Sequence, residues 1–150
     1  LQTQTIRIGH LKRICVIDGQ GGGIGAVVIK ALKEARGESI ELVDLGTNAI
    51  AAAQMLKAGA NRAASGENAI RRTTTTADVI IGPISIGWAN AMLGEITPKM
   101  AEAIMSSPAP KIFLPLSQEA VILVGVSAEP LPHLVQQLVT KKLREVLPDV

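Results

Sequence analysis

VIDGQGGGIG, residues 16–25, is the stretch of sequence that decides the fold of this chain. It places five glycines in ten positions, directly after the β-prone run RICVID (Arg13–Asp18). From Ile24 to Gly37 the apolar residues recur at helical spacing instead of strand spacing. A strand, a glycine-rich turn and a helix in this order are typical of the first βα unit of a Rossmann-like domain.

The rest of the chain alternates between strand-like and helix-like segments. Further strands are predicted at residues 39–45, 61–64, 77–82, 111–116 and 120–126, and helices at 49–59, 67–72, 98–107 and 132–146. The run TTTT (73–76) is interpreted as a linker or an extended stretch. Because few residues separate the last two strands, we expect them to form an antiparallel edge pair.

These segments predict an α/β, Rossmann-like, doubly wound fold with a mostly parallel sheet of about five or six strands. Residues 1–12 are expected to be a peripheral segment that includes His10. Residues 13–150 are expected to form a single domain, since no linker is long enough to divide them.

Composition argues against several classes of protein. The net charge is only +2, the basic residues are scattered, and 1% of residues are aromatic, which disfavours a nucleic-acid-binding protein. No apolar run approaches about 18 residues, so no membrane span is predicted. The single cysteine, Cys15, suits a reducing cytoplasm, where we expect the protein to reside.

The glycine turn itself suggests a cofactor site, because glycines let the backbone approach a pyrophosphate at the positive end of a helix. Asp44 follows near the end of the second strand, where a ribose-binding acid is expected, so NAD, NADP or another nucleotide is the predicted ligand. Asp18 argues against a plain pyrophosphate site, since its charge would repel the phosphate. The alternative is that the glycines only pack the helix onto the strand and that Asp44 is a solvated strand end.

A second signal lies after two other predicted strands. GTNAI (46–50) recurs as GENAI twenty residues later, and Ser85 and Ser117 also follow strands. Because the carboxyl ends of parallel strands meet at one edge, these segments are expected to form one rim with the glycine turn. The predicted cofactor-binding residues are Gly19, Gln20, Gly21, Gly22, Gly23, Ile24, Gly25, Asp44, Thr47, Asn48, Asn68, Gly82 and Ser85.

The sequence offers few catalytic groups. Two histidines and one cysteine at unsuitable spacing predict no zinc-type metal site, and no GxSxG motif occurs. The glycine turn resembles that of short-chain dehydrogenases, but the chain has no tyrosine to serve as their proton donor. Among the acidic residues near the predicted rim, which are Asp18, Asp44, Glu67 and Glu95, the candidate catalytic residues are Glu67, as the first choice, and Asp18, with Mg²⁺ as a possible accessory ion.

Several longer runs carry a resemblance to a known family. DGQGGGIG (18–25), LGTNA (45–49), MLKAGA (55–60), GENAI (66–70), IIGPI (80–84) and MLGEITPKMAEAI (92–104) resemble a family of short bacterial proteins described as a domain of unknown function. The resemblance covers residues 13 to 126. It implies a stand-alone cytoplasmic protein with a Rossmann-like fold, and it brings no catalytic residues.

Three hypotheses about function follow. The first is a nucleotide- or dinucleotide-binding protein, such as a small NAD(P)-linked redox enzyme or sensor. The second is a Mg²⁺-assisted enzyme that acts on a small phosphorylated or carboxylated metabolite. The third is a non-catalytic assembly module, because the Ala-rich helix at 49–59 and the helix at 98–107 leave apolar faces. A homo-oligomer is expected in each case.

Overall fold

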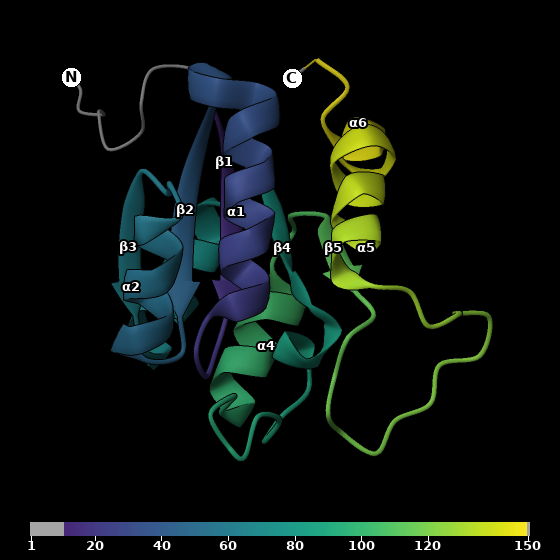
Figure 1. Ribbon diagram of the computed structural model, residues 1–150. Helices are drawn as coiled ribbons and strands as arrows, with labels where there is room; N and C mark the ends of the chain where they lie inside the picture. Colours follow the sequence, from purple (N-terminus) through teal and green to yellow (C-terminus); the bar gives the residue numbers. More distant parts are fainter. Residues whose placement is uncertain (1–10, 150) are drawn as a thin grey trace.

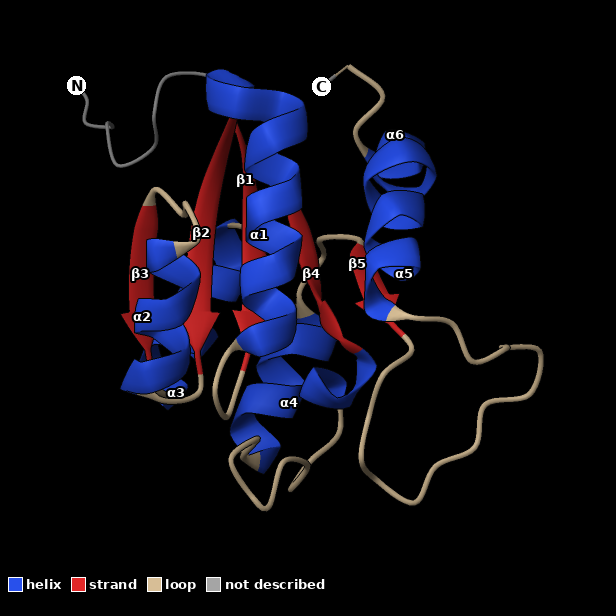
Figure 2. Ribbon diagram, in the orientation of Figure 1, coloured by secondary structure: helices blue, strands red, loops and turns tan. Residues whose placement is uncertain are grey.

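The computed structural model describes residues 11–149 and contains one five-stranded sheet with the strand order β3-β2-β1-β4-β5. Every neighbouring pair is parallel, so the predicted α/β, Rossmann-like, doubly wound fold is confirmed (Figure 2). The predicted segment 1–12, His10 included, lies outside the described residues except for its last two positions. The strands are β1 (Lys12–Asp18), β2 (Ile40–Gly46), β3 (Arg62–Ser65), β4 (Val79–Pro83) and β5 (Lys111–Leu114).

Helices cover both faces of this sheet (Figure 1). Residues of α1, α2, α5 and α6 pack in one core cluster, and residues of α3 and α4 pack in a second cluster on the other face. The helices are α1 (Gly23–Arg36), α2 (Ala49–Lys57), α3 (Glu67–Thr73), α4 (Pro98–Ser106), α5 (Leu131–Gln137) and α6 (Leu143–Val146). Short helical turns add η2 (Gly37–Ser39), η3 (Thr74–Thr76), η4 (Ile84–Gly87) and the π-helical η5 (Leu138–Lys142).

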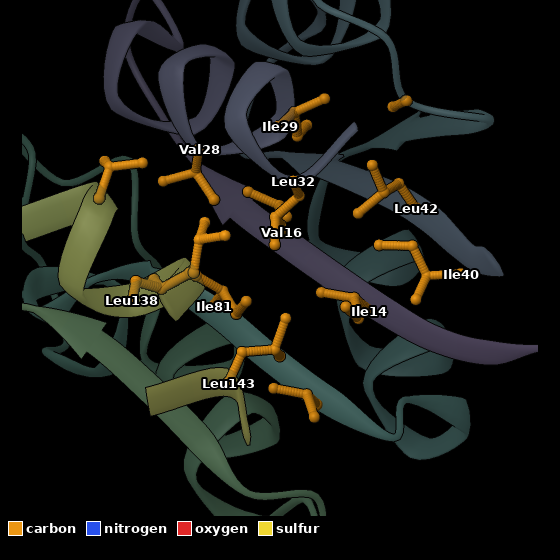
Figure 3. Packing of buried hydrophobic residues seen from close by; sticks show 14 of the residues in the cluster. Ile14, Val16, Val28, Ile29, Leu32, Ile40, Leu42, Ile81, Leu138 and Leu143 are labelled. Atoms are coloured by element: carbon orange, nitrogen blue, oxygen red, sulfur yellow. The ribbon is translucent and has the colours of Figure 1, made fainter. Parts of the chain in front are cut away.

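The core is built from aliphatic side chains. Figure 3 shows strand residues such as Val16 and Ile81 facing Val28 of α1 and Leu138 of the C-terminal helical segment. The aromatic residues Trp88 and Phe113 are only partly buried against the second cluster. Burial of many Ile, Val and Leu side chains therefore supplies most of the stabilisation, at about 25 cal/mol for each Å² of apolar surface.

Local capping explains where two helices begin. The Asn48 side-chain oxygen accepts a hydrogen bond from the Ala51 amide at 2.8 Å and so starts α2. Thr97 caps α4 by accepting from the Met100 amide at 3.1 Å, and Pro98 follows at the first helical position. Both start signals were present in the sequence.

The TTTT run differs from its prediction. Residues Thr74–Thr76 form a 3₁₀ turn that continues α3, rather than a linker or an extended stretch. The physical reason is that the threonine hydroxyls donate to carbonyl oxygens of the preceding turn, as Thr74 does to Ile70 at 2.8 Å. These bonds hold the chain in a helical conformation.

The predicted antiparallel strand at 120–126 is wrong. After β5 the Leu116 amide donates to the Leu114 carbonyl at 2.7 Å, a tight turn that takes the chain out of the sheet. Pro115 also lacks the amide hydrogen needed to continue the ladder. The chain from 115 to 130 is therefore a long loop, extending away from the sheet in Figure 1.

Candidate functional site

A cavity of about 500 Å³ lies at the carboxyl ends of β1 and β4. Since β1 pairs with β2 on one side and with β4 on the other, this is the point at which the chain reverses its direction across the sheet. Ligands of open α/β sheets bind at such a switch point. The cavity is lined by Asp18 to Ile24, Pro83, Ser85, Met92, Leu93 and Leu116 to Glu119.

The glycine turn forms one wall of the cavity. The Gly22 amide donates to the Gly19 carbonyl at 2.9 Å, and Gly22 adopts a left-handed conformation with φ 74° before α1 begins. Gln20 is also left-handed, with φ 50°, a conformation that is unfavourable for a residue with a side chain. The turn is thus a tight, internally bonded structure and not an open loop.

Asp18 points into this turn and caps α1. Its two carboxylate oxygens accept hydrogen bonds from the amides of Gly19 and Gly25, each at 2.8 Å. Burial raises the pKa of Asp18 above its ordinary value, while the amide hydrogen bonds from Gly25, Gly19 and Ile24 oppose that rise. The protein's own carboxylate therefore takes up two of the amides around the N-terminus of α1 that a bound anion could otherwise use.

Two amides of the turn are left for a ligand. The amides of Gly19 and Gly22 are bonded within the turn, and the Gln20 amide donates to Glu95 at 2.8 Å. Within residues 11–149, neither Gly21 nor Gly23 donates an amide hydrogen bond, and both residues line the cavity. The site can offer these two donors to an acceptor oxygen.

Glu95 connects the glycine turn to the loop after β2. One oxygen, Oε1, accepts three hydrogen bonds. They come from the backbone amide of Gln20 at 2.8 Å, the Thr47 hydroxyl at 2.6 Å and the side-chain Nδ2 of Asn48 at 3.0 Å. Burial alone would raise the pKa of Glu95, but the three hydrogen bonds together hold it below its ordinary value. An ionised Glu95 thus fixes Thr47 and Asn48 against the turn.

The segment Asn90–Gly94 forms a second wall in an unusual backbone conformation. Asn90, Met92, Leu93 and Gly94 all have positive φ, between 57° and 90°. Each non-glycine residue with a positive φ adds on the order of 1 kcal/mol of backbone strain. Such strained residues are common at ligand sites. Leu93 lines the cavity and is 98% exposed, so its apolar side chain is in contact with solvent at the edge of the site.

The charged side chains on the cavity wall are carboxylates. Asp18 and Glu119 line it, whereas no Lys, Arg or His does so among the described residues. In residues 11–149, no group of three or more His, Cys, Asp or Glu side chains is placed to hold a metal ion. An anionic ligand would therefore bind more tightly together with a counter-cation, which reduces its repulsion from these carboxylates.

The structure brings some of the predicted site residues together and separates others. The glycine turn and Ser85 share the cavity, and Thr47 and Asn48 adjoin it through Glu95. Glu67 and Asn68 lie elsewhere: Glu67 accepts a hydrogen bond from the Thr97 hydroxyl at 2.6 Å, and Asn68 lines a separate hollow. Glu67 and Asp18 therefore do not form a pair.

Asp44 and Gly82 occupy structural positions. Asp44 lies within β2, is 0% exposed, and neither of its carboxyl oxygens has a hydrogen-bond partner. Burial raises its pKa to about 7. At Gly82 a side chain would lie 2.4 Å from the Ile17 carbonyl oxygen, so glycine is required there for β1 and β4 to approach. Neither residue lines the cavity.

The GTNAI and GENAI repeats begin their helices at different positions. In the first copy Asn48 is the capping residue, whereas in the second copy Gly66, with φ 97°, precedes the helix and Asn68 lies inside it. Equal sequence spacing thus does not give equal geometry here.

Sequence reasoning missed Met92, Leu93 and Gln118 as lining residues. The available signal was positional, since residues after β5 must lie at the same edge as those after β1 and β4.

The chain matches a family model described as a domain of unknown function over residues 13–147. The chain belongs to the DUF3842 family. The match covers all of the sheet except Lys12, the first residue of β1, and it includes the C-terminal helices. No curated protein matches the sequence. Among the described residues, no helix of this DUF3842 chain is long and apolar enough to cross a membrane.

Proposed function

We propose that this protein binds a nucleotide or dinucleotide, with NAD and NADP among the candidate ligands, in the cavity at the glycine turn. The observation that carries the proposal is the pair of unbonded amides at Gly21 and Gly23 on the wall of a cavity at the sheet's switch point. A phosphate oxygen is the acceptor that such amides suit.

The apolar lining of the cavity suits a base. Ile24, Pro83, Met92, Leu93 and Leu116 form this lining, and the polar side chains of Ser85, Ser117 and Gln118 can bond the edge of a ring. A volume of about 500 Å³ lies within the range of small-molecule sites. The carboxylates of Asp18 and Glu119 predict that a nucleotide binds more tightly as its Mg²⁺ complex.

We propose binding rather than turnover. Asp18 is occupied in capping α1, and Glu67 is bonded to Thr97 outside the cavity, so neither candidate acid is placed to act on a ligand there. A sensor or carrier of the nucleotide is the role that these residues support.

The test is to titrate the protein with NAD, NADH, NADP, NADPH, ATP and AMP, each with and without Mg²⁺. Calorimetry measures the binding, and thermal denaturation measures the shift of the melting midpoint. A ligand at 100 times its Kd raises stability by about 2.7 kcal/mol, which is readily measured. Absence of any shift at millimolar concentrations would contradict the proposal.

Gly23→Ala is expected to weaken binding at least about tenfold, equivalent to about 1.4 kcal/mol, without unfolding the protein. A Cβ at Gly23 meets no atom within 4 Å, so the fold tolerates it, yet it occupies the space that a phosphate needs. Calorimetry on Gly23→Ala and on Ala53→Val, a control on the exposed side of α2, measures the effect. Equal affinities would mean that the glycine serves only the turn.

We also propose that the protein self-associates through residues 120–126. Val121, Ile122, Val124 and Val126 are all exposed there, Ile122 at 93% and Val124 at 99%. This segment carries four large exposed apolar side chains, against Ile50 and Leu56 on α2 and Met105 on α4, the helices from which the sequence predicts pairing.

The double variant Ile122→Ser with Val124→Ser is expected to raise the dissociation constant for self-association at least about tenfold, since it removes two apolar contacts. Sedimentation velocity over a range of concentrations measures it. The control, Ile50→Ser with Leu56→Ser, alters exposed aliphatic residues of α2 and should leave association unchanged. A wild-type monomer at every concentration would refute this proposal.

A further inference from the structure

A second hollow lies between α3 and α4, on the face of the sheet away from α1. It has a volume of about 420 Å³. The polar side chains that line this α3–α4 hollow are Asn68, Arg71, Arg72, Lys99, Glu102 and Ser106. None of them lines the cavity at the glycine turn.

The walls of the α3–α4 hollow are held in fixed positions. The Thr97 hydroxyl donates to Glu67 at 2.6 Å and so joins the first residue of α3 to the residue that caps α4. The two helices are also joined by their apolar side chains, since Ile70 of α3 and Met100 and Ile104 of α4 are buried in one core cluster. The backbone of the two helices around the hollow is therefore fixed, which lowers the entropic cost of binding, while the polar side chains that line the hollow are exposed.

The charges around the hollow are unbalanced. Arg71, Arg72 and Lys99 supply three cations, against one carboxylate from Glu102. In the part of the chain that the structure describes, none of these three cations forms an ion pair that would neutralise its charge. Like charges placed around one hollow repel one another, and an anion between them removes that repulsion.

We propose that the α3–α4 hollow is a binding site for a small polyanion, of the class of metabolites that carry two or more phosphate groups. Guanidinium groups bind phosphate oxygens in pairs, and Lys99 adds a compact charge. The side-chain amide of Asn68 on α3 and the hydroxyl of Ser106 on α4 supply neutral donors, one from each helix.

The size of the hollow and the residues around it favour a small ligand over a nucleic acid. The hollow is confined between two short helices of seven and nine residues, and its lining contains no aromatic side chain on which a base could stack. The site is independent of the proposed nucleotide cavity, whose charged lining residues are carboxylates.

Inorganic pyrophosphate and tripolyphosphate are the probes, because they carry the charge without a base. Calorimetry at low salt on the full chain is expected to show saturable binding that is tighter for tripolyphosphate and weaker as salt is added. The double variant Arg71→Gln with Arg72→Gln is expected to weaken polyphosphate binding at least tenfold. The double variant Arg71→Lys with Arg72→Lys, which keeps both charges, is expected to weaken it by a smaller factor. Gly23→Ala should leave polyphosphate binding unchanged, which separates this site from the nucleotide cavity.

The matched control, Lys57→Gln with Lys141→Gln, removes the same number of exposed positive charges elsewhere and should retain wild-type affinity. An equal loss in this control would show a diffuse charge effect and overturn the proposal, as would the absence of polyphosphate binding at low salt. Tighter binding of a single-stranded oligonucleotide, abolished by the same arginine variants, would also overturn it in favour of a nucleic-acid surface.

Discussion

Arg13→Met is expected to lower the free energy of unfolding by about 3–5 kcal/mol. Arg13 and Glu41 lie on adjacent strands and are 4% and 0% exposed. The Arg13 Nε donates to Glu41 Oε1 at 2.8 Å and Nη2 donates to Oε2 at 3.3 Å. Methionine would leave the Glu41 carboxylate buried with Arg62, 4.0 Å away, as its nearest remaining cation.

Two controls separate the buried pair from ordinary charge loss. Lys142→Met breaks the exposed pair with Glu145, which is 3.3 Å long, and should change stability by less than about 1 kcal/mol. The double variant Arg13→Met with Glu41→Leu should recover much of the loss, because no buried charge remains. Urea denaturation measures all three. If Arg13→Met behaves like Lys142→Met, the pair contributes little to stability.

Most of the fold could be predicted because local and long-range signals agree. Strand periodicity up to Asp18, helical periodicity from Ile24 and the capping residues Asn48 and Thr97 each specify an element independently. The failure at 120–126 has a physical cause. At 120–126 the apolar run has the composition of a strand, but strand formation depends on a neighbour that the turn at Leu116 removes.

The candidate site was less predictable than the fold. Topology alone places residues after β1, β2 and β4 at one edge, which is why Thr47, Asn48 and Ser85 were found. It does not say which way Asp18 turns, and the side-chain conformation decides whether the carboxylate repels a phosphate or caps α1. Met92 and Leu93 also adopt left-handed conformations that residues with side chains rarely adopt, so no local sequence pattern predicts the backbone conformation there.

Asp44 shows that a residue near the end of a strand need not lie on the rim of the sheet. The sequence predicts that the second strand ends at Leu45, and β2 runs to Gly46. By strand alternation Asp44 faces the same way as Ile40 and Leu42, toward the core with α1 and α2. Because burial raises the pKa of this carboxyl to about 7, it is mostly neutral below that pH, and this has a measurable consequence.

Asp44→Asn is expected to remove a large part of the dependence of stability on pH. Burial raises the pKa of Asp44 from 3.8 to about 7, so between these values the folded state binds more protons than the unfolded state. Stability is then fully present below the unfolded pKa and is lost as pH rises through the folded pKa. The wild type should lose about 3 kcal/mol, relative to the variant, between pH 5 and pH 8.

Urea denaturation of both proteins at pH 5, 6, 7 and 8 tests this. Asp18, whose pKa burial also raises, is present in both proteins and cancels from their difference. Asp149→Asn, the same substitution at an exposed position, should give a profile parallel to that of the wild type. Nucleotide affinity should be unchanged in Asp44→Asn, because Asp44 does not line the cavity. A profile of Asp44→Asn parallel to the wild type would mean that Asp44 is ionised in the folded protein, and a loss of nucleotide binding would return this residue to the ribose-binding role.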